Sequence, residues 1–218
     1  MTPVTTGEAT AIELAIAGVE ARTGVQVVAA VVARADAYPE LPWRAFALGA
    51  SLAALIALLV DIARPDWLTA KELLIQTLAT LGGGGVAGLF ATRIPAFAKR
   101  FLGSGRAQAE VRQCAESMFL TRELFATPRR DAILVLASQF ERRVVIVPDV
   151  FYKGRIGHAE WEAVVAQMTP KLRDGRTADA FAAGLATIES MLVAKGFAGA
   201  GSASRNALPD ALVRGEAP

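Results

Sequence analysis

The stretch DAILVLASQFERRVVIVPD, residues 131–149, decides the fold of this chain. Asp131 to Ser138 is an almost uninterrupted apolar run, and Arg143 to Pro148 is a second run that is rich in β-branched residues. Short apolar runs of this kind are typical of strands that are buried inside a sheet. The intervening segment, Gln139 to Arg142, is short enough to turn the chain into a hairpin. We therefore expect two neighbouring antiparallel strands within an α/β domain.

Segments nearer the two ends of the chain complete this domain. VQVVAAVVA, Val25 to Ala33, carries no charge and predicts a third buried strand. The helix before it has Thr5 or Thr6 available as N-cap and Gly24 as its stop. Apolar residues at helical spacing predict helices over residues 8–22, 105–125, 158–172 and 177–195. Strands between helices indicate an α/β fold with a small mixed sheet flanked by helices.

An apolar middle segment interrupts the domain. WRAFALGASLAALIALLVDI, Trp43 to Ile62, has no charge between Arg44 and Asp61, and LLIQTLATLGGGGVAGLFAT, Leu73 to Thr92, has none at all. Each is close to the roughly 20 apolar residues that a helix needs to cross a bilayer. The alternative is a pair of buried helices in a soluble bundle, but the first segment lacks the polar stripe of such a helix. We therefore expect a transmembrane hairpin inserted into the α/β domain.

The flanks of the hairpin predict its orientation. Trp43 and Trp67 are expected to anchor it at the membrane–water interfaces. Basic residues precede the first span and follow the second, namely Arg22, Arg34 and Arg44, then Arg93, Lys99, Arg100 and Arg106. The positive-inside rule then places both termini and the α/β domain in the cytoplasm, in a two-span protein of the inner (cytoplasmic) membrane. The lipid bilayer is thus one expected partner, and no signal peptide is evident.

These boundaries divide the chain into four parts. Residues 1–36 and 105–198 are expected to form the two parts of one α/β domain, because neither part can bury its strands alone. Residues 37–104 are the expected hairpin insertion, and closing the domain around it costs little entropy if its ends lie close together. Residues 199–218 are small and polar with prolines, so we expect a disordered tail.

Composition excludes several classes of function. The net charge is only +2, from 23 basic and 21 acidic residues, without the basic patch that nucleic-acid binding requires. Cys114 is the single cysteine, so no intrachain disulfide can form, and we expect a buried, inert thiol. The glycine run of residues 82–85 lacks the lysine of a phosphate loop. Because neither span has an ionisable residue at mid-depth, an ion pathway is not indicated.

The order of these segments resembles the TPM-domain family, and in particular its membrane-embedded branch with a two-helix insertion. The likeness covers Thr6 to Ala33 and Ala107 to Lys195. It is carried by the opening helix with TGVQVV, by RDAILVLAS and ERRVVIVPD at residues 130–138 and 141–149, and by Trp161 in the following helix. The resemblance implies acid phosphatase activity as in some members, calcium binding as in others, or a role in assembling or maintaining membrane complexes.

Asp131 and Asp149 are the candidate ligands for calcium or another divalent cation. They stand at the start of one predicted strand and at the end of its neighbour, and these ends are adjacent in an antiparallel pair. The family commonly has a polar turn such as Asn-Asp-Gly here, whereas this chain keeps the aspartate but has Ala132 in place of the glycine. Two carboxylates are too few for such an ion, and the alternative is that each aspartate caps a strand end or a turn.

Two further groups carry weaker hypotheses. Arg130 and Arg143, with their neighbouring arginines, are candidates for binding an anion, since guanidinium groups pair with phosphates. Solvated charges that protect a sheet edge are the alternative. His158 is a candidate general acid or base, although a histidine at a helix start is more often a surface residue.

Two hypotheses for the function follow. The first is an interaction or assembly module that docks on another membrane protein or on itself. The second is a metal-dependent acid phosphatase, which the family resemblance implies and which requires Asp131 and Asp149 to converge with further oxygen ligands.

Overall fold

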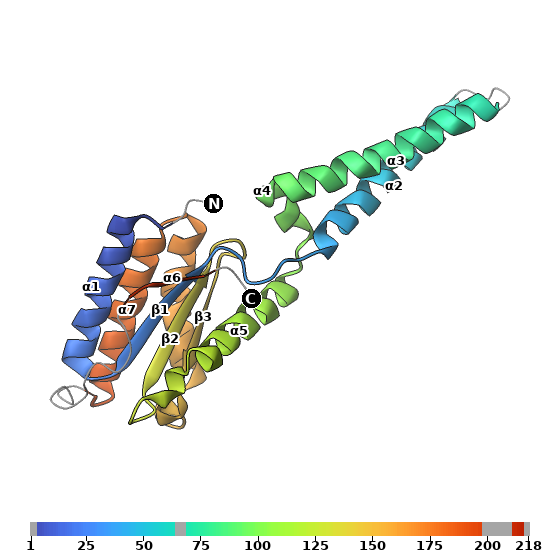
Figure 1. The fold of residues 1–218 in the computed structure, drawn as a ribbon. Helices are drawn as coiled ribbons and strands as arrows, with labels where there is room; N and C mark the ends of the chain where they lie inside the picture. The colour runs from blue at the N-terminus through green and yellow to red at the C-terminus, as the bar shows by residue number, and fades with distance from the viewer. Residues whose placement is uncertain (1–3, 64–68, 198–210, 216–218) are drawn as a thin grey trace. The chain divides into compact units, whose positions relative to one another are not determined.

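The computed structural model describes residues 4–63, 69–197 and 211–215 (Figure 1). The chain forms two compact units, one from residues 1–36 and 107–218 and the other from residues 37–106. The first unit holds the sheet and the second holds the long apolar helices. Trp67, which we predicted as a membrane anchor, lies outside the described residues.

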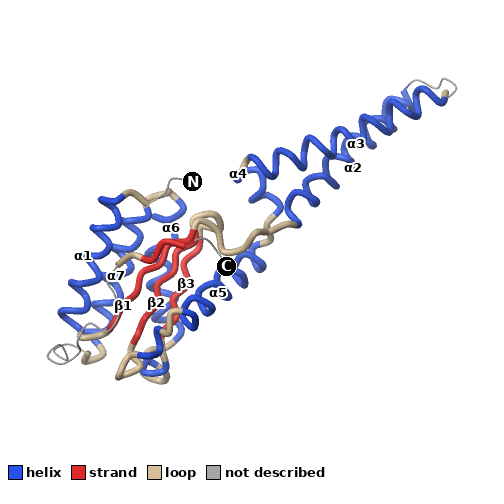
Figure 2. Tube along the Cα trace, in the orientation of Figure 1, coloured by secondary structure: helices blue, strands red, loops and turns tan. Residues whose placement is uncertain are grey.

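The sheet of the first unit has four strands in the order β3-β2-β1-β4. β1 (Gln26–Val32) lies parallel to β2 (Ala132–Ser138), and β3 (Arg143–Pro148) runs antiparallel to β2. All residues of β1 and β2 are buried, as their uncharged and largely apolar sequences predict. The sheet is therefore mixed and flanked by helices, which agrees with the predicted fold class (Figure 2).

Helices cover both faces of this sheet (Figure 1). α1 (Thr6–Thr23), α6 (His158–Arg173) and α7 (Thr177–Ala194) share one apolar core with alternate residues of the strands. α5 (Ser104–Thr121) shares a second core with the other residues. This division follows from the period of two along a strand, which sends successive side chains to opposite faces.

The start and end of α1 show how the local sequence sets an element. Thr5 is the N-cap, with its hydroxyl accepting from the Glu8 N–H and the Glu8 carboxylate accepting from the Thr5 N–H. Gly24 ends the helix in the left-handed conformation at φ 68°, which glycine adopts without a Cβ penalty. The chain then enters β1 directly.

The predicted disordered tail needs a correction. Val213–Gly215 forms β4, which pairs in parallel with Ala30–Val32 of β1. Leu212 and Val213 are buried, and the Leu212 N–H donates to the Glu13 carboxylate at 3.1 Å. Without β4, the β1 edge of the sheet would be open, and two apolar side chains give this segment enough burial to order it. Residues 199–210 and 216–218 lie outside the described residues.

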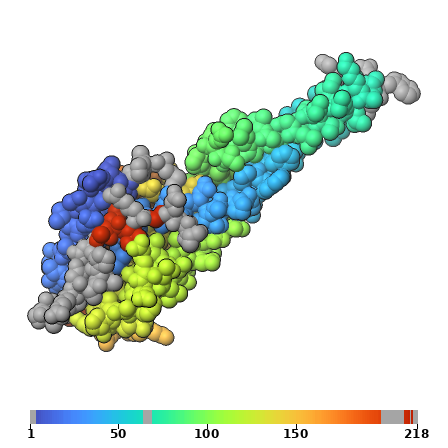
Figure 3. All heavy atoms as spheres, in the orientation of Figure 1, coloured from blue at the N-terminus to red at the C-terminus, as the bar shows by residue number. Residues whose placement is uncertain are grey.

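The second unit consists mainly of two long helices. α2 (Glu40–Ala63) and α3 (Ala70–Arg93) pack along each other, followed by the short α4 (Pro95–Ala98). In Figure 3 their atoms lie against one another along their length. The contact is close at Gly49, where an added Cβ would lie 2.6 Å from the Gly83 carbonyl oxygen. The glycine run thus serves a helix–helix contact.

Candidate functional site

The two candidate aspartates lie at one end of the β2–β3 pair. Asp131 precedes β2 and Asp149 follows β3, and the Asp149 N–H donates to the Ala132 carbonyl at 2.9 Å. The Tyr152 hydroxyl donates to the Asp131 carbonyl at 2.8 Å. The two aspartates therefore lie at adjacent strand ends, as we expected from the antiparallel pairing. The buried Tyr152 stabilises the start of β2 through its hydrogen bond to Asp131.

Each of these carboxylates faces an arginine. Arg130 donates from Nε and Nη2 to the two oxygens of Asp149, both at 2.9 Å, and Arg129 Nε lies 3.5 Å from Asp131 Oδ2. The hydrogen bonds to Asp149 raise the pKa of Arg130 further above its usual range. Asp149 also accepts from the Val150 N–H at 2.6 Å, so it caps the turn that follows β3. The aspartates are thus buried acids with cationic partners.

Tyr152 is locked as a hydrogen-bond donor. Burial raises its pKa well above the usual range, and the nearby charge of Asp131 raises it further. Its ring packs edge-on against Trp161, with ring centroids 5.8 Å apart. A tyrosine that keeps its proton and is fixed by packing is a structural support for the strand end.

The donor set at this strand end does not fit a divalent cation. Calcium takes about six to eight oxygen ligands. Asp131 Oδ2 is buried without a hydrogen bond, but both oxygens of Asp149 are held by Arg130. Among the described residues there is no group of three or more His, Cys, Asp or Glu side chains that could hold a metal. Each of the two carboxylates has an arginine as its cationic partner.

Arg130 and Arg143 do not form one anion site. Arg143 is paired with Ser138 at the far end of β2, whereas Arg130 immediately precedes the start of that strand. At about 3.3 Å per residue, the length of β2 separates them by roughly 20 Å. Arg143 Nη1 instead donates to Gln108 Oε1 on α5 at 2.6 Å.

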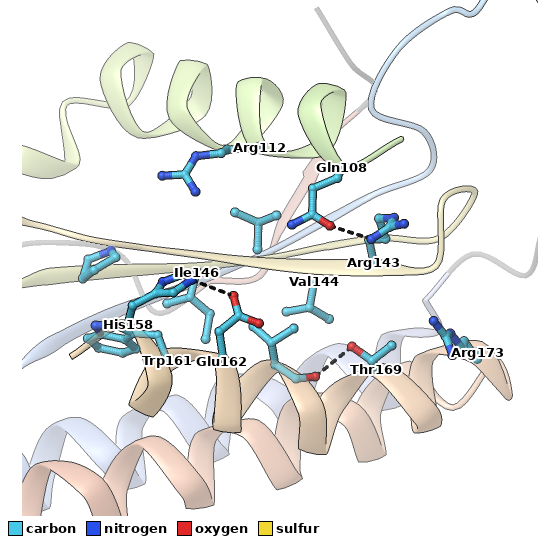
Figure 4. Close-up of a pocket in the computed structure, with 13 residues that line it drawn as sticks. Gln108, Arg112, Arg143, Val144, Ile146, His158, Trp161, Glu162, Thr169 and Arg173 are labelled. Atoms are coloured by element: carbon cyan, nitrogen blue, oxygen red, sulfur yellow. Dashed lines mark hydrogen bonds and ion pairs between the residues drawn. The ribbon is translucent and has the colours of Figure 1, made fainter. Parts of the chain in front are cut away.

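A groove of about 420 Å³ runs along the edge strand β3 (Figure 4). α5 forms one wall with Gln108 and Arg112, and Arg143 reaches toward this wall from the strand. The other wall is α6, which contributes His158, Trp161, Glu162, Val165, Thr169 and Arg173. This groove was not predicted from the sequence. The sequence did indicate the edge strand and its arginines. It did not indicate that α5 and α6 would enclose that edge.

The groove is basic. Three arginines line it, Arg112, Arg143 and Arg173, against the single carboxylate of Glu162. His158 Nε2 lies 3.5 Å from Glu162 Oε1, and its side chain is exposed, so the structure shows it as a surface residue at the start of α6. Arg112 also pairs with Glu116, one turn further along α5.

The helices of the second unit present an apolar surface. Among the described residues, three helices are long and apolar enough to cross a membrane, α2, α3 and α7. α7 buries its apolar face in the core that it shares with α1, α6 and the strands, whereas α2 and α3 leave almost all of theirs exposed. Trp43 is 72% exposed near the start of α2, and its ring packs against Phe46 at 6.1 Å. The large exposed side chains include Leu52, Leu55, Leu59, Leu74, Leu78 and Leu81.

Comparison with known proteins places these features in context. Residues 69–191 match the model of the TPM domain, a family model named TPM phosphatase. The chain is also similar in fold to the BA42 protein from the psychrophilic bacterium Bizionia argentinensis, known from an NMR structure. That likeness has a TM-score of 0.57 at 12% identity, and covers 98% of this chain and 97% of that chain. No curated protein matches the sequence.

Proposed function

The chain belongs to the TPM domain family, and from this premise we propose that it is a membrane-anchored TPM domain that acts as an interaction or assembly module for membrane complexes. Its partners are the lipid bilayer and another membrane protein or a second copy of itself. The proposal places it among the members of the family that carry a two-helix membrane insertion.

The exposed apolar surface of α2 and α3 carries this proposal. Each helix has 24 residues, so each is about 36 Å long and exceeds the roughly 30 Å of a bilayer's hydrocarbon core. The mean hydropathy of their apolar windows is 2.3 and 1.5. Soluble proteins rarely expose continuous apolar surface of this extent, whereas lipid covers it at no cost.

The interior of the helix pair is also suited to lipid. Small residues let membrane helices approach closely, and the Gly49–Gly83 contact has this character. Two polar side chains, one near the end of α2 and one near the start of α3, satisfy each other. Gln76 Nε2 donates to both oxygens of Asp61 at 2.7 and 2.8 Å. Paired polar groups are the form in which such residues are tolerated near a membrane.

The proposed orientation keeps both termini and the sheet unit in the cytoplasm. The chain re-emerges through Arg93 and the Lys99–Arg100 pair after α3, and these charges favour the cytoplasmic face of an inner membrane. An even number of spans keeps the two parts of the sheet unit on one side, as the pairing of β1 with β2 requires.

Extraction of membranes with alkaline carbonate tests the anchor. The full chain is expected to stay in the membrane pellet, because two apolar spans cannot be released by removing electrostatic contacts. Release of the chain into the supernatant would contradict the proposal. Orientation is tested by attaching a membrane-impermeant maleimide to a cysteine introduced near the C-terminus in intact cells, where protection from labelling is expected.

The alternative function is a metal-dependent acid phosphatase. It is favoured by the name of the family model and by the buried Asp131 oxygen that lacks a hydrogen bond. The arginine partners of both aspartates argue against a metal there. Hydrolysis of p-nitrophenyl phosphate at acidic pH, with calcium or magnesium added, tests this alternative. Turnover that depends on the metal and is lost in Asp131→Asn would establish it in place of the interaction module.

A further inference from the structure

The edge strand β3 presents unpaired backbone groups to the groove. In an antiparallel pair, hydrogen-bonded residues alternate along each strand. The Asp149 N–H bonds to Ala132, so the groups of Val147, Val145 and Arg143 also point toward β2. Those of Val144 and Ile146 must then point outward, together with the Pro148 carbonyl. Among the described residues, no strand lies beyond β3.

The groove lies where one further strand would pair with β3. Its floor is this open edge, and its walls are α5 and α6 on either face (Figure 4). The outward groups offer two N–H donors and three carbonyl acceptors, since Pro148 has no N–H. A segment of about five or six residues would match them by adding a strand to the sheet.

The two walls differ in chemistry. The α5 side presents Arg112, Gln108 and the Arg143 side chain. The α6 side combines the apolar surfaces of Trp161 and Val165 with one acidic and one basic residue, Glu162 and Arg173. Because successive side chains of a strand point to opposite faces, an added strand would direct alternate residues to a basic wall and to a partly apolar wall.

We propose that the β3 edge binds an extended segment of a partner protein in which acidic and β-branched residues alternate. The inference rests on the proposed function, because it names the partner class of the interaction module. Backbone pairing with Val144 and Ile146 supplies the attachment, and the arginines of the groove select the acidic face of the segment.

The charges select this occupant over a second copy of the chain. Pairing of two β3 edges would bring together two grooves that each hold three arginines and one carboxylate, and the like net charges repel. Pro148 also removes a donor from the strand end, a device that natural edges use against self-pairing.

The test uses the full chain in phosphatidylcholine nanodiscs and two fluorescein-labelled peptides. The first is fluorescein-Glu-Val-Glu-Val-Glu-Val-amide, and the second is the same peptide with every internal backbone nitrogen methylated. N-methylation removes the donors for strand pairing and leaves the charges unchanged. Anisotropy is expected to show saturable binding of the first peptide and none of the second, with empty nanodiscs as the blank.

Two variants locate the binding. Ile146→Pro removes an outward N–H without breaking the β2 ladder, and binding is expected to fall at least about tenfold. Arg112→Glu is expected to weaken binding about fivefold, whereas Arg122→Glu, the same charge change outside the groove, leaves it unaltered. Hydrogen exchange should show new protection confined to the segment of residues 141–148 when the first peptide is bound.

Several results would overturn the inference. They are equal binding of both peptides, no binding of either, protection elsewhere in the chain, or a concentration-dependent dimer that the first peptide fails to dissociate. If Ile146→Pro does not fold, the N-methylated peptide alone decides. The membrane anchor is measured separately by carbonate extraction. A chain that stays in the pellet but binds no peptide would contradict peptide binding at the β3 edge and would leave the membrane anchor supported.

Discussion

Arg130 and Asp149 form a two-pronged ion pair across the β2–β3 strand ends, with both nitrogen–oxygen distances at 2.9 Å. Arg130 reaches this position from a left-handed backbone conformation at φ 55°. The Asp149 side chain is only 3% exposed, whereas that of Arg130 is 50% exposed. The pair therefore neutralises a buried charge from the solvent side.

Arg130→Gln is expected to lower the melting temperature of the full chain in detergent. The change leaves a buried carboxylate without its cation, which costs more than the loss of an exposed ion pair. Arg112→Gln is the control and should have the smaller effect, because both side chains of its ion pair with Glu116 are exposed. Adding Asp149→Asn to Arg130→Gln should recover part of the loss. A double variant less stable than Arg130→Gln would contradict this account.

Glu160 is expected to make stability depend on pH in the acidic range. Its hydrogen bond with Lys195 and its cap on the Gly157 N–H hold its pKa below the ordinary 4.5. A lowered folded-state pKa gives stability that is present above the unfolded value and is lost as the pH falls through the folded value. Melting temperatures of wild type and Glu160→Gln should therefore differ at pH 7 and converge on acidification. Glu162→Gln, on the same helix, lacks this cap and serves as the control.

Gly49→Val is expected to disrupt the packing of α2 on α3. A Cβ at this position would meet Gly83 and Ala87, both at 2.6 Å, so the helices must move apart. Overpacking of this kind costs about 1–3 kcal/mol. Gly82→Val is the matched control, because nothing lies within 4 Å of a Cβ there. Unfolding in SDS followed by circular dichroism measures both. Equal destabilisation would show that glycine flexibility, and not close packing, matters.

Leu55→Arg combined with Leu59→Arg is expected to reduce membrane insertion. Both side chains are more than half exposed in α2, within the proposed hydrocarbon region. Each arginine costs about 2.5–3.5 kcal/mol near the centre of a spanning helix. Leu14→Arg is the control, since Leu14 is 70% exposed on α1 in the sheet unit. The fraction of chain in the carbonate pellet measures the effect. A pellet fraction unchanged by the double variant would remove the proposed span.

The elements of the sheet unit were largely predictable, because each is encoded locally. The apolar runs around Val28 and Val135 have the length and residue types of buried strands, and both are fully buried. The Thr5 cap and the Gly24 stop set the limits of α1 through contacts within a few residues. The tail was mispredicted because β4 owes its order to a distant edge of the sheet, and composition carries no information about that edge.

The candidate site was predictable only in part. That Asp131 and Asp149 share one end of the sheet follows from the hairpin alone. Their arginine partners were not foreseen, because the left-handed turn at Arg130 decides where that side chain points. The groove along β3 was missed for a related reason, since α5 and α6 reach it from opposite sides of the sheet.

The sequence by itself determined the three central strands, the helices that flank them and the two long apolar helices, since periodicity, capping and apolar length act over a few residues. Only the tertiary structure decided which residues meet. It paired Asp149 with Arg130, added β4 to the edge of β1, and left the β3 edge open between two helices. These outcomes depend on side-chain direction and strand order, which contacts between distant segments set.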